Sequence, residues 1–256
     1  MKWGDFYGPE YANRLYSGVR RHMSQPFRFV CLTDDDRGLA EGIETLPLPD
    51  VAVPGSDDLR WRKVGVFRQN LFGLSGSAIF LDLDVVVVDD LVPIFELPGQ
   101  FHVCRERDLF PHRMRAARRF LFKRRRYRWA NREGNTSVFR FELGGHGEIF
   151  ERYRTEAGKI VRKFRREQEF VTLEARRLGI LNYLPKGTCV SFRDDCVRFG
   201  PASYLHEPKV PEGARVVVFT SGITMQDALT GRASRWYRRI PPVEWLREAW
   251  SDPAPR

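Results

Sequence analysis

The chain has 256 residues, of which 42% are hydrophobic and 13% aromatic, which is enough for one α/β domain with its own core and excludes a disordered chain. The net charge is +10, but residues 113–132 contain ten Arg and Lys and no acid, so the rest is formally neutral (10 − 10 = 0). No apolar run approaches the roughly 20 residues that span a bilayer. The N-terminus has no signal-peptide core, so we expect a cytosolic protein.

Strands and helices alternate along most of the predicted chain. Helices are expected over 11–19, 147–157 and 167–178, around Val64, Phe67 and Leu71 up to Gly73, and for about one turn over 92–97. Strands are expected over 27–35, 41–49, 77–84, 101–106, 136–143 and 214–222. This order is typical of a single α/β domain with a mixed, mostly parallel sheet and flanking helices. We expect the domain over 1–231, with 113–132 as a basic insertion between two core strands, and a tail over 232–256 that packs on it.

The start of the chain differs from the usual pattern of such a domain. A buried strand normally comes first, whereas here a predicted helix follows Met1 almost at once. We expect either that the sheet lacks its first strand or that the natural start lies upstream.

The cysteines show no zinc-binding spacing. We interpret all four as reduced packing residues, namely Cys31, Cys104, Cys189 and Cys196.

Two carboxylates interrupt the most apolar stretch, IFLDLDVVVVDDL (79–91). On a strand, Asp82 and Asp84 would point to the same side, and a buried charge is normally paired, hydrogen-bonded or bound to metal. Strands of open α/β sheets present ligands at their carboxyl ends, and hard cations such as Mg²⁺ or Mn²⁺ prefer carboxylate oxygens. The alternative is that Asp82 and Asp84 cap neighbouring loops or helices, and an Asp-x-Asp alone does not decide between the two.

Four stretches in this order resemble the GT-A fold of nucleotide-sugar glycosyltransferases, especially family 8 and its bacterial relatives. They are RFVCLTDD (28–35), WRKVGVF (61–67) with IFLDLDVVVVDDL, GNTSVFRFE (134–142), and REQEF (166–170) followed by LNYLP (181–185). Together they cover most of residues 1–220.

The resemblance implies roles for individual residues on the donor side. Asp82 and Asp84 match the family's Asp-x-Asp, which holds a divalent metal, Mn²⁺ or Mg²⁺, against the donor diphosphate. Lys63 lies where the family has a basic residue near the donor, and its alternative is a solvated surface lysine. Asn135 matches an Asn that contacts the donor sugar or acceptor, and its alternative is a turn residue after Gly134.

The resemblance also implies candidates for catalysis. Glu167 and Gln168 match the family's Asp-Gln pair under the reacting carbon of the sugar. An oxygen atom at that place stabilises the positive charge that develops as the glycosidic bond breaks. The alternative for Glu167 is an acidic residue in the first turn of a helix, where the helix dipole favours it.

The chain departs from the family after the last predicted strand. Thr220 stands where the family has a metal-binding His, and no phosphate-binding Lys follows. Thr220 or Ser221 would be left to hydrogen-bond the donor phosphate, and Gly222 would leave backbone N–H groups open to an anion. His206 is a possible replacement ligand. This departure puts the metal affinity and the activity in doubt.

The resemblance implies an enzyme that transfers a hexose from a nucleotide-diphosphate sugar to a hydroxyl of a glycan or lipid-linked acceptor, with metal and with retention of configuration. The alternative is a catalytically degenerate relative that binds anionic surfaces. A phosphatase of the haloacid-dehalogenase type shares an Asp-x-Asp, but the Lys and acidic pair that it needs after VVVFTS are missing.

The basic segment 113–132 leaves three functions open. Its arginines and aromatic residues suit an anionic membrane at the inner face of the cell, an acidic acceptor, or RNA, although nucleic acid is the least favoured partner. A solvated segment that only aids solubility is the fourth alternative.

Overall fold

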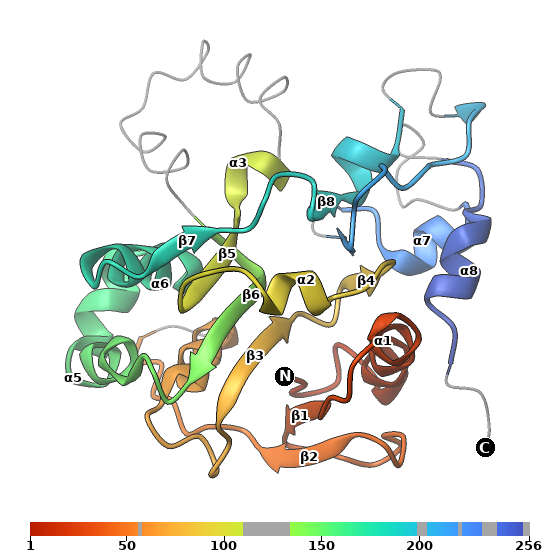
Figure 1. Ribbon diagram of the computed structural model, residues 1–256. Coiled ribbons are helices and arrows are strands. Elements are labelled where there is room, and N and C mark those ends of the chain that lie inside the picture. Colours follow the sequence, from red (N-terminus) through yellow and green to blue (C-terminus); the bar gives the residue numbers. More distant parts are fainter. Residues whose placement is uncertain (56–57, 110–133, 199–203, 220–221, 232–239, 253–256) are drawn as a thin grey trace.

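The computed structural model describes residues 1–55, 58–109, 134–198, 204–219, 222–231 and 240–252 (Figure 1). The described strands form three sheets, in the orders β1-β2, β3-β6-β5-β7 and β4-β9-β8. Their bounds are β1 Val30–Thr33, β2 Glu44–Pro47, β3 Gly76–Leu81, β4 Val85–Val87, β5 Phe101–Arg105, β6 Gly134–Leu143, β7 Leu181–Tyr183, β8 Cys189–Ser191 and β9 Val216–Val218.

The sheets are mixed, as predicted, but not mostly parallel. Among the described strands, β1–β2, β5–β7 and β8–β9 pair in parallel, whereas β3–β6, β5–β6 and β4–β9 pair antiparallel. The long strand β6 causes much of this difference, because it runs between β3 and β5 and is antiparallel to both.

The predicted strand 77–84 is interrupted. β3 ends at Leu81 and β4 begins at Val85, and the two belong to different sheets. The Asp82 N–H still donates to the Ser137 carbonyl of β6 at 2.9 Å, while the Phe219 N–H donates to the Asp84 carbonyl at 3.0 Å. The change of partner from β6 to β9 therefore happens between the two carboxylates, which lie in a turn rather than on one strand.

Helices pack on the outer sides of these sheets (Figure 1). α5 and α6 lie together beside β6 and share a core with it, whereas α7 and α8 lie at the other end of the molecule beside β4. The bounds are α1 Pro9–His22, α2 Val92–Phe95, α3 Glu106–Leu109, α5 Gly147–Lys163, α6 Glu167–Arg177, α7 Met225–Thr230 and α8 Glu244–Ala249. The short β8 is followed by one π-helical turn, η3 Phe192–Cys196.

The predicted helix around Val64 is a 3-10 helix, η1 Leu59–Phe67, and it ends before Leu71. Trp61 and the five consecutive residues 63–67 are buried, so the segment has no single apolar stripe of the α-helical kind. Gly65 allows this close packing, since a Cβ there would lie 2.7 Å from side-chain atoms of Pro49 and Val51. The tight packing of η1 fixes where Lys63 points.

The N-terminal end of the described chain pairs with β1, and the C-terminal end packs against helix α1. Residue Lys2 forms one parallel bridge to Thr33 of β1, rather than a full strand. At the other end, the ring of Trp250 lies 5.2 Å from that of Tyr11, and the Arg14 guanidinium stacks over it. The described part of the tail includes α8, a regular helix, and its Trp250 packs on α1.

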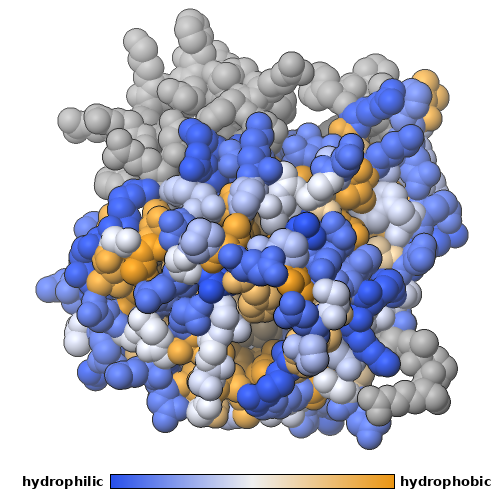
Figure 2. Space-filling view, viewed as in Figure 1, coloured by the Kyte–Doolittle hydropathy of each residue, from blue (hydrophilic) through white to orange (hydrophobic). Residues whose placement is uncertain are grey.

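The four cysteines are buried and unbridged, which agrees with the expected packing role. No helix in the described ranges has both the length and the apolar character needed to cross a membrane. The face shown in Figure 2 is largely hydrophilic, with hydrophobic residues in small groups.

Candidate active site

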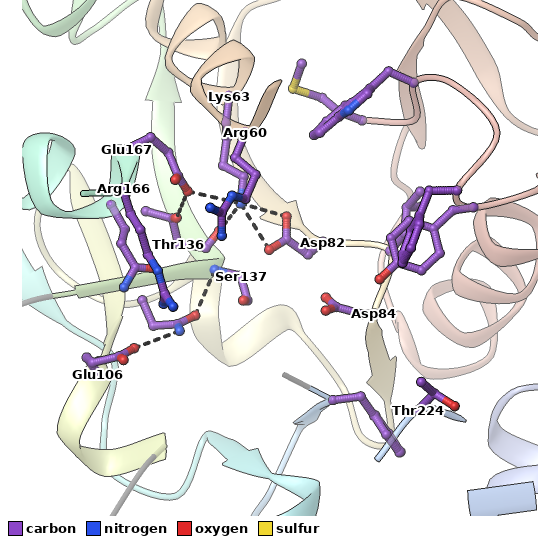
Figure 3. Close-up of a pocket in the computed structure, with 18 of the residues that line it drawn as sticks. Arg60, Lys63, Asp82, Asp84, Glu106, Thr136, Ser137, Arg166, Glu167 and Thr224 are labelled. Atoms are coloured by element: carbon purple, nitrogen blue, oxygen red, sulfur yellow. Dashed lines mark hydrogen bonds and ion pairs between the residues drawn. The ribbon is translucent and has the colours of Figure 1, made fainter. Parts of the chain in front are cut away.

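A pocket of about 640 Å³ lies where the turn at Asp82–Asp84 meets the start of β6 and the first turn of α6 (Figure 3). The N-terminal residues before α1 and the chain after β9 complete its wall. It is lined by Met1, Trp3, Phe6, Tyr7, Arg60, Lys63, Asp82, Leu83, Asp84, Glu106, Asn135, Thr136, Ser137, Arg166, Glu167, Gln168, Phe219, Gly222, Ile223 and Thr224. Six predicted site residues therefore face one cavity, although they come from four separate segments.

Lys63 is the centre of a buried ionic network. Its Nζ lies 2.7 Å from Asp82 Oδ1 and 3.7 Å from Glu167 Oε1, and it donates to the Thr136 carbonyl at 3.1 Å. The Lys63 side chain is only 8% exposed, so the solvated surface lysine is excluded. Burial lowers the pKa of the ammonium, but Asp82 and Glu167 more than offset this and leave the pKa raised. Lys63 is therefore charged and joins the two acidic sides of the pocket.

Asp84 has a different environment from Asp82. Burial, and then the negative charge of Asp82, raise the pKa of Asp84 to about 7. Lys63 acts in the opposite direction but binds Asp82 directly. A cation placed between the two carboxylates would relieve their repulsion, so this pair is electrostatically suited to a divalent metal.

The two carboxylates are an incomplete metal site by themselves. No cluster of three or more His, Cys, Asp or Glu side chains suited to a metal ion occurs within the residues described. His206 is exposed and does not line the pocket, so it does not replace the family's His. Thr220 and Ser221 lie outside the described residues. The carboxylate oxygens of Asp82 and Asp84 are of the ligand type that Mn²⁺ and Mg²⁺ prefer.

Asn135 is held rigidly at the start of β6. Its Nδ2 donates to Glu106 Oε2 at 2.9 Å, and its Oδ1 accepts from the Ser137 N–H at 3.0 Å. Both Asn135 and Glu106 are buried, which excludes the simple turn residue considered for Asn135. Sequence reasoning missed Glu106. It is the last residue of the predicted strand 101–106, and an acid at a strand end is the pattern that would have indicated it.

Glu167 and Gln168 open helix α6 and are both buried against the pocket. Thr136 Oγ1 donates to Glu167 Oε1 at 2.9 Å. The backbone of this turn is fixed by Thr172, whose hydroxyl donates to the Gln168 carbonyl at 2.7 Å and accepts from the Gly134 N–H at 2.9 Å. Both alternatives for Glu167 therefore apply, because it is an acidic residue in the first turn of a helix and it also lines the pocket.

Two arginines at the same end of the pocket were not predicted. Arg60 projects from η1 beside Lys63, and Arg166 precedes α6 beside Glu167 (Figure 3). Arg166 belongs to the stretch REQEF. Its position next to Glu167, which the family resemblance had matched, could have indicated it as a site residue.

Aromatic residues from the N-terminal segment also line the pocket. Phe6 and Tyr7 meet edge to face with ring centroids 4.8 Å apart, and Phe6 is 85% exposed. Burial, with the nearby charge of Asp84, raises the pKa of Tyr7. Trp3 lines the same pocket. Flat aromatic faces beside a carboxylate pair suit stacking of a planar ring such as a nucleobase.

The fold is similar to those of solved glycosyltransferases. The galactosyltransferase LgtC, solved with donor and acceptor sugar analogues, gives a TM-score of 0.59 at 12% identity over 96% of this chain and 93% of that chain. Mouse xyloside xylosyltransferase 1 gives a TM-score of 0.50 at 12% identity, over 83% of this chain and 93% of that chain. The glycosyltransferase GlyE of Streptococcus pneumoniae gives a TM-score of 0.51 at 15% identity, over 97% of this chain and 58% of that chain.

This likeness confirms the GT-A fold that the sequence resemblance predicted. No family model and no curated protein sequence matches the chain. Similarity at this level of identity establishes the fold, whereas the reaction has to be inferred from the residues that line the pocket.

Proposed function

We propose that the protein is a glycosyltransferase that moves a hexose from a nucleotide-diphosphate sugar to an acceptor hydroxyl. One observation carries this proposal: a single cavity in a GT-A fold holds Asp82 and Asp84, the charged Lys63, and the polar pair Glu167 and Gln168. These are the groups needed to hold a diphosphate and to stabilise a positively charged sugar at the same time.

The residues divide between the two halves of the donor. Asp82 and Asp84 would hold Mn²⁺ or Mg²⁺, which would supply Lewis-acid neutralisation of the charge on the departing nucleoside diphosphate. Lys63 keeps Asp82 oriented and adds positive charge beside the diphosphate. Gly222 and Thr224 also line the pocket and offer polar groups to phosphate, together with Thr220 and Ser221 from sequence alone.

The sugar half of the donor lies towards α6. Glu167 and Gln168 face the reacting carbon, where their oxygens stabilise oxocarbenium-like charge, and Asn135 orients sugar hydroxyls. The family resemblance adds retention of configuration and an acceptor of the glycan or lipid-linked glycan class. Segment 113–132 supplies contact with an anionic acceptor or with the inner face of a membrane.

Metal-dependent donor hydrolysis tests this function. Native protein should hydrolyse a nucleotide sugar slowly with Mn²⁺ and lose the activity with EDTA. Asp84→Asn should abolish it while the circular dichroism spectrum is unchanged, and Asp36→Asn, which changes an exposed aspartate outside the pocket, should not. Equal turnover by Asp84→Asn and native protein would contradict the metal assignment. No turnover with any donor, but retained binding to anionic vesicles, would identify the degenerate binding protein instead.

A further inference from the structure

The end of α5 and its link to α6 carry a dense group of exposed cations. Residues 159–166 read KIVRKFRR, with five basic residues and no acid. Lys159, Arg162, Lys163 and Arg165 are exposed, and none of these four side chains forms an ion pair with another described residue. We call these four residues the α5 patch.

The core packing of α5 turns the patch towards solvent. The helix buries its opposite side through Ile149, Phe150, Tyr153, Ala157 and Ile160. Arg162 and Lys163 lie three and four residues after Lys159, so the three side chains are neighbours on the helix surface. The helix ends at Lys163, and Arg165 follows in the link to α6. The patch therefore forms one continuous surface at this end of α5.

The charge of this surface remains positive when the nearby acids are counted. Residues 156–169 contain five basic and three acidic residues, which gives a net charge of +2 (5 − 3 = 2). Arg166 and Glu167 line the pocket and cancel each other. The four cations of the patch then stand against Glu156 and Glu169, and the surface keeps a net charge of +2 (4 − 2 = 2).

A structural role explains only part of the patch. Cations in the last turn of a helix are favoured by the helix dipole, which accounts for Arg162 and Lys163. Lys159 precedes that turn, and Arg165 lies beyond the end of the helix. Helix capping therefore leaves half of the patch without a function inside the protein.

The patch offers charge without a surface for base stacking. Phe164 is the aromatic residue of the run 159–166, and it is half-buried. Its ring meets that of Phe170 edge to face at 5.8 Å, and the Lys163 ammonium lies over it at 5.2 Å. Proteins that grip single-stranded nucleic acid normally add stacked aromatic rings to their positive charge. A surface of lipid phosphates needs only the charge.

We propose that the α5 patch binds an anionic phospholipid bilayer and so holds the pocket beside a membrane. This inference does not depend on the proposed function, and it concerns a surface separate in sequence from 113–132. Each Lys or Arg near an anionic bilayer strengthens binding by roughly fivefold. Since Arg166, the next residue after the patch, lines the pocket, a bound bilayer would lie next to that cavity.

The test measures co-sedimentation with vesicles of phosphatidylcholine, with and without phosphatidylglycerol. The patch variant carries Lys159→Gln, Arg162→Gln, Lys163→Gln and Arg165→Gln. The matched control carries Arg20→Gln, Arg154→Gln, Lys186→Gln and Lys209→Gln, four exposed cations from separate places in the chain. Both variants lower the net charge by four, so only the clustering of the lost cations differs.

We expect native protein to bind the vesicles that contain phosphatidylglycerol and to bind more weakly as salt rises. The patch variant should lose affinity by about tenfold or more, whereas the control should stay within about threefold. The same loss should occur in protein whose segment 113–132 is replaced by a Gly/Ser linker, because the two surfaces act separately. Nucleoside diphosphate binding with Mn²⁺ should be unchanged in both variants.

Three outcomes would overturn the inference. Native protein that ignores phosphatidylglycerol vesicles at low salt has no such surface. Equal losses in the patch and control variants would show that overall charge, rather than the α5 patch, attracts the bilayer. Tighter binding to a single-stranded RNA than to the vesicles, lost in the patch variant, would assign the patch to nucleic acid. None of these outcomes bears on the transferase reaction, which donor hydrolysis tests separately.

Discussion

The ammonium of Lys63 lies 2.7 Å from Asp82 and 3.7 Å from Glu167, so one buried cation connects the proposed metal-binding turn with the first turn of α6. The two elements come from different parts of the chain, and both are hydrogen-bonded to β6, through Ser137 on one side and Gly134 on the other. Lys63 and Thr136 add a direct side-chain link between them.

Lys63→Met should destabilise the protein by about 3 kcal/mol, because it leaves Asp82 and Glu167 without their cation in a largely buried place. Urea unfolding followed by fluorescence measures this loss. Lys159→Met, at an exposed position of α5, should change stability by less than about 0.5 kcal/mol. A Lys63→Met protein as stable as the control would show that the network adds nothing to folding.

Mn²⁺ affinity should depend on pH through Asp84. The pKa of this carboxyl is raised to about 7, so below pH 7 a metal ion must displace a proton, and affinity should fall by up to about tenfold per pH unit. Above pH 7 the affinity should be constant. The stability of the metal-free protein should depend on pH in the opposite direction to the metal affinity. The raised pKa of Asp84 stabilises the folded state at low pH, and this contribution is lost as pH rises towards 7.

Calorimetric titration with Mn²⁺ between pH 5.5 and 8.5 checks this dependence. Asp84→Asn, which cannot bind the proton, should show weak binding with no such slope. A native protein whose Mn²⁺ affinity is the same at both ends of this range would place the metal elsewhere.

Gln168→Ala should lower the catalytic rate by about 10²–10³-fold while affinity for the nucleoside diphosphate is unchanged, since the side chain is proposed to act on the sugar in the transition state. Steady-state kinetics and calorimetry on the same preparation separate the two effects. Gln100→Ala, at an exposed position before β5, is the control. A loss of nucleotide affinity equal to the loss of rate would show that Gln168 only supports the pocket.

Replacement of 113–132 by a Gly/Ser linker should reduce transfer to an anionic acceptor more than it reduces donor binding, because the segment carries the whole excess charge of the chain. The comparison needs transfer rates at two salt concentrations and the donor affinity of both proteins. Native transfer should also weaken as salt rises. Equal loss of donor and acceptor binding would instead indicate a structural role. The segment lies outside the described residues, so this prediction comes from sequence alone.

The sequence predicted the element types and the carboxylate pair because these depend on local patterns. The apolar run around Asp82 and Asp84 marked a buried strand, and two charges within it required an explanation. The break between β3 and β4 was not predictable, since it depends on pairing with β6 and β9, which are distant in sequence. The 3-10 geometry of η1 likewise depends on its burial against Pro49 and Val51.

The site residues were predictable only where a resemblance located them. Nothing local distinguishes Lys63 from an exposed lysine, and its burial follows from carboxylates that are 19 and more residues away. Glu106 and the two arginines had no motif of their own. Their proximity comes from the tertiary arrangement of η1, α3 and α6.

Thermal unfolding with UDP, GDP and their sugar conjugates, each with and without Mn²⁺, tests the central claim most directly. Ligand at about 100 times its dissociation constant adds about 2.7 kcal/mol of stability, which raises the Tm of a protein of this size by several degrees. The proposed function predicts such a rise with one nucleotide class, larger with Mn²⁺ and absent in Asp84→Asn. A flat response to the whole panel from folded protein would contradict a nucleotide-sugar transferase.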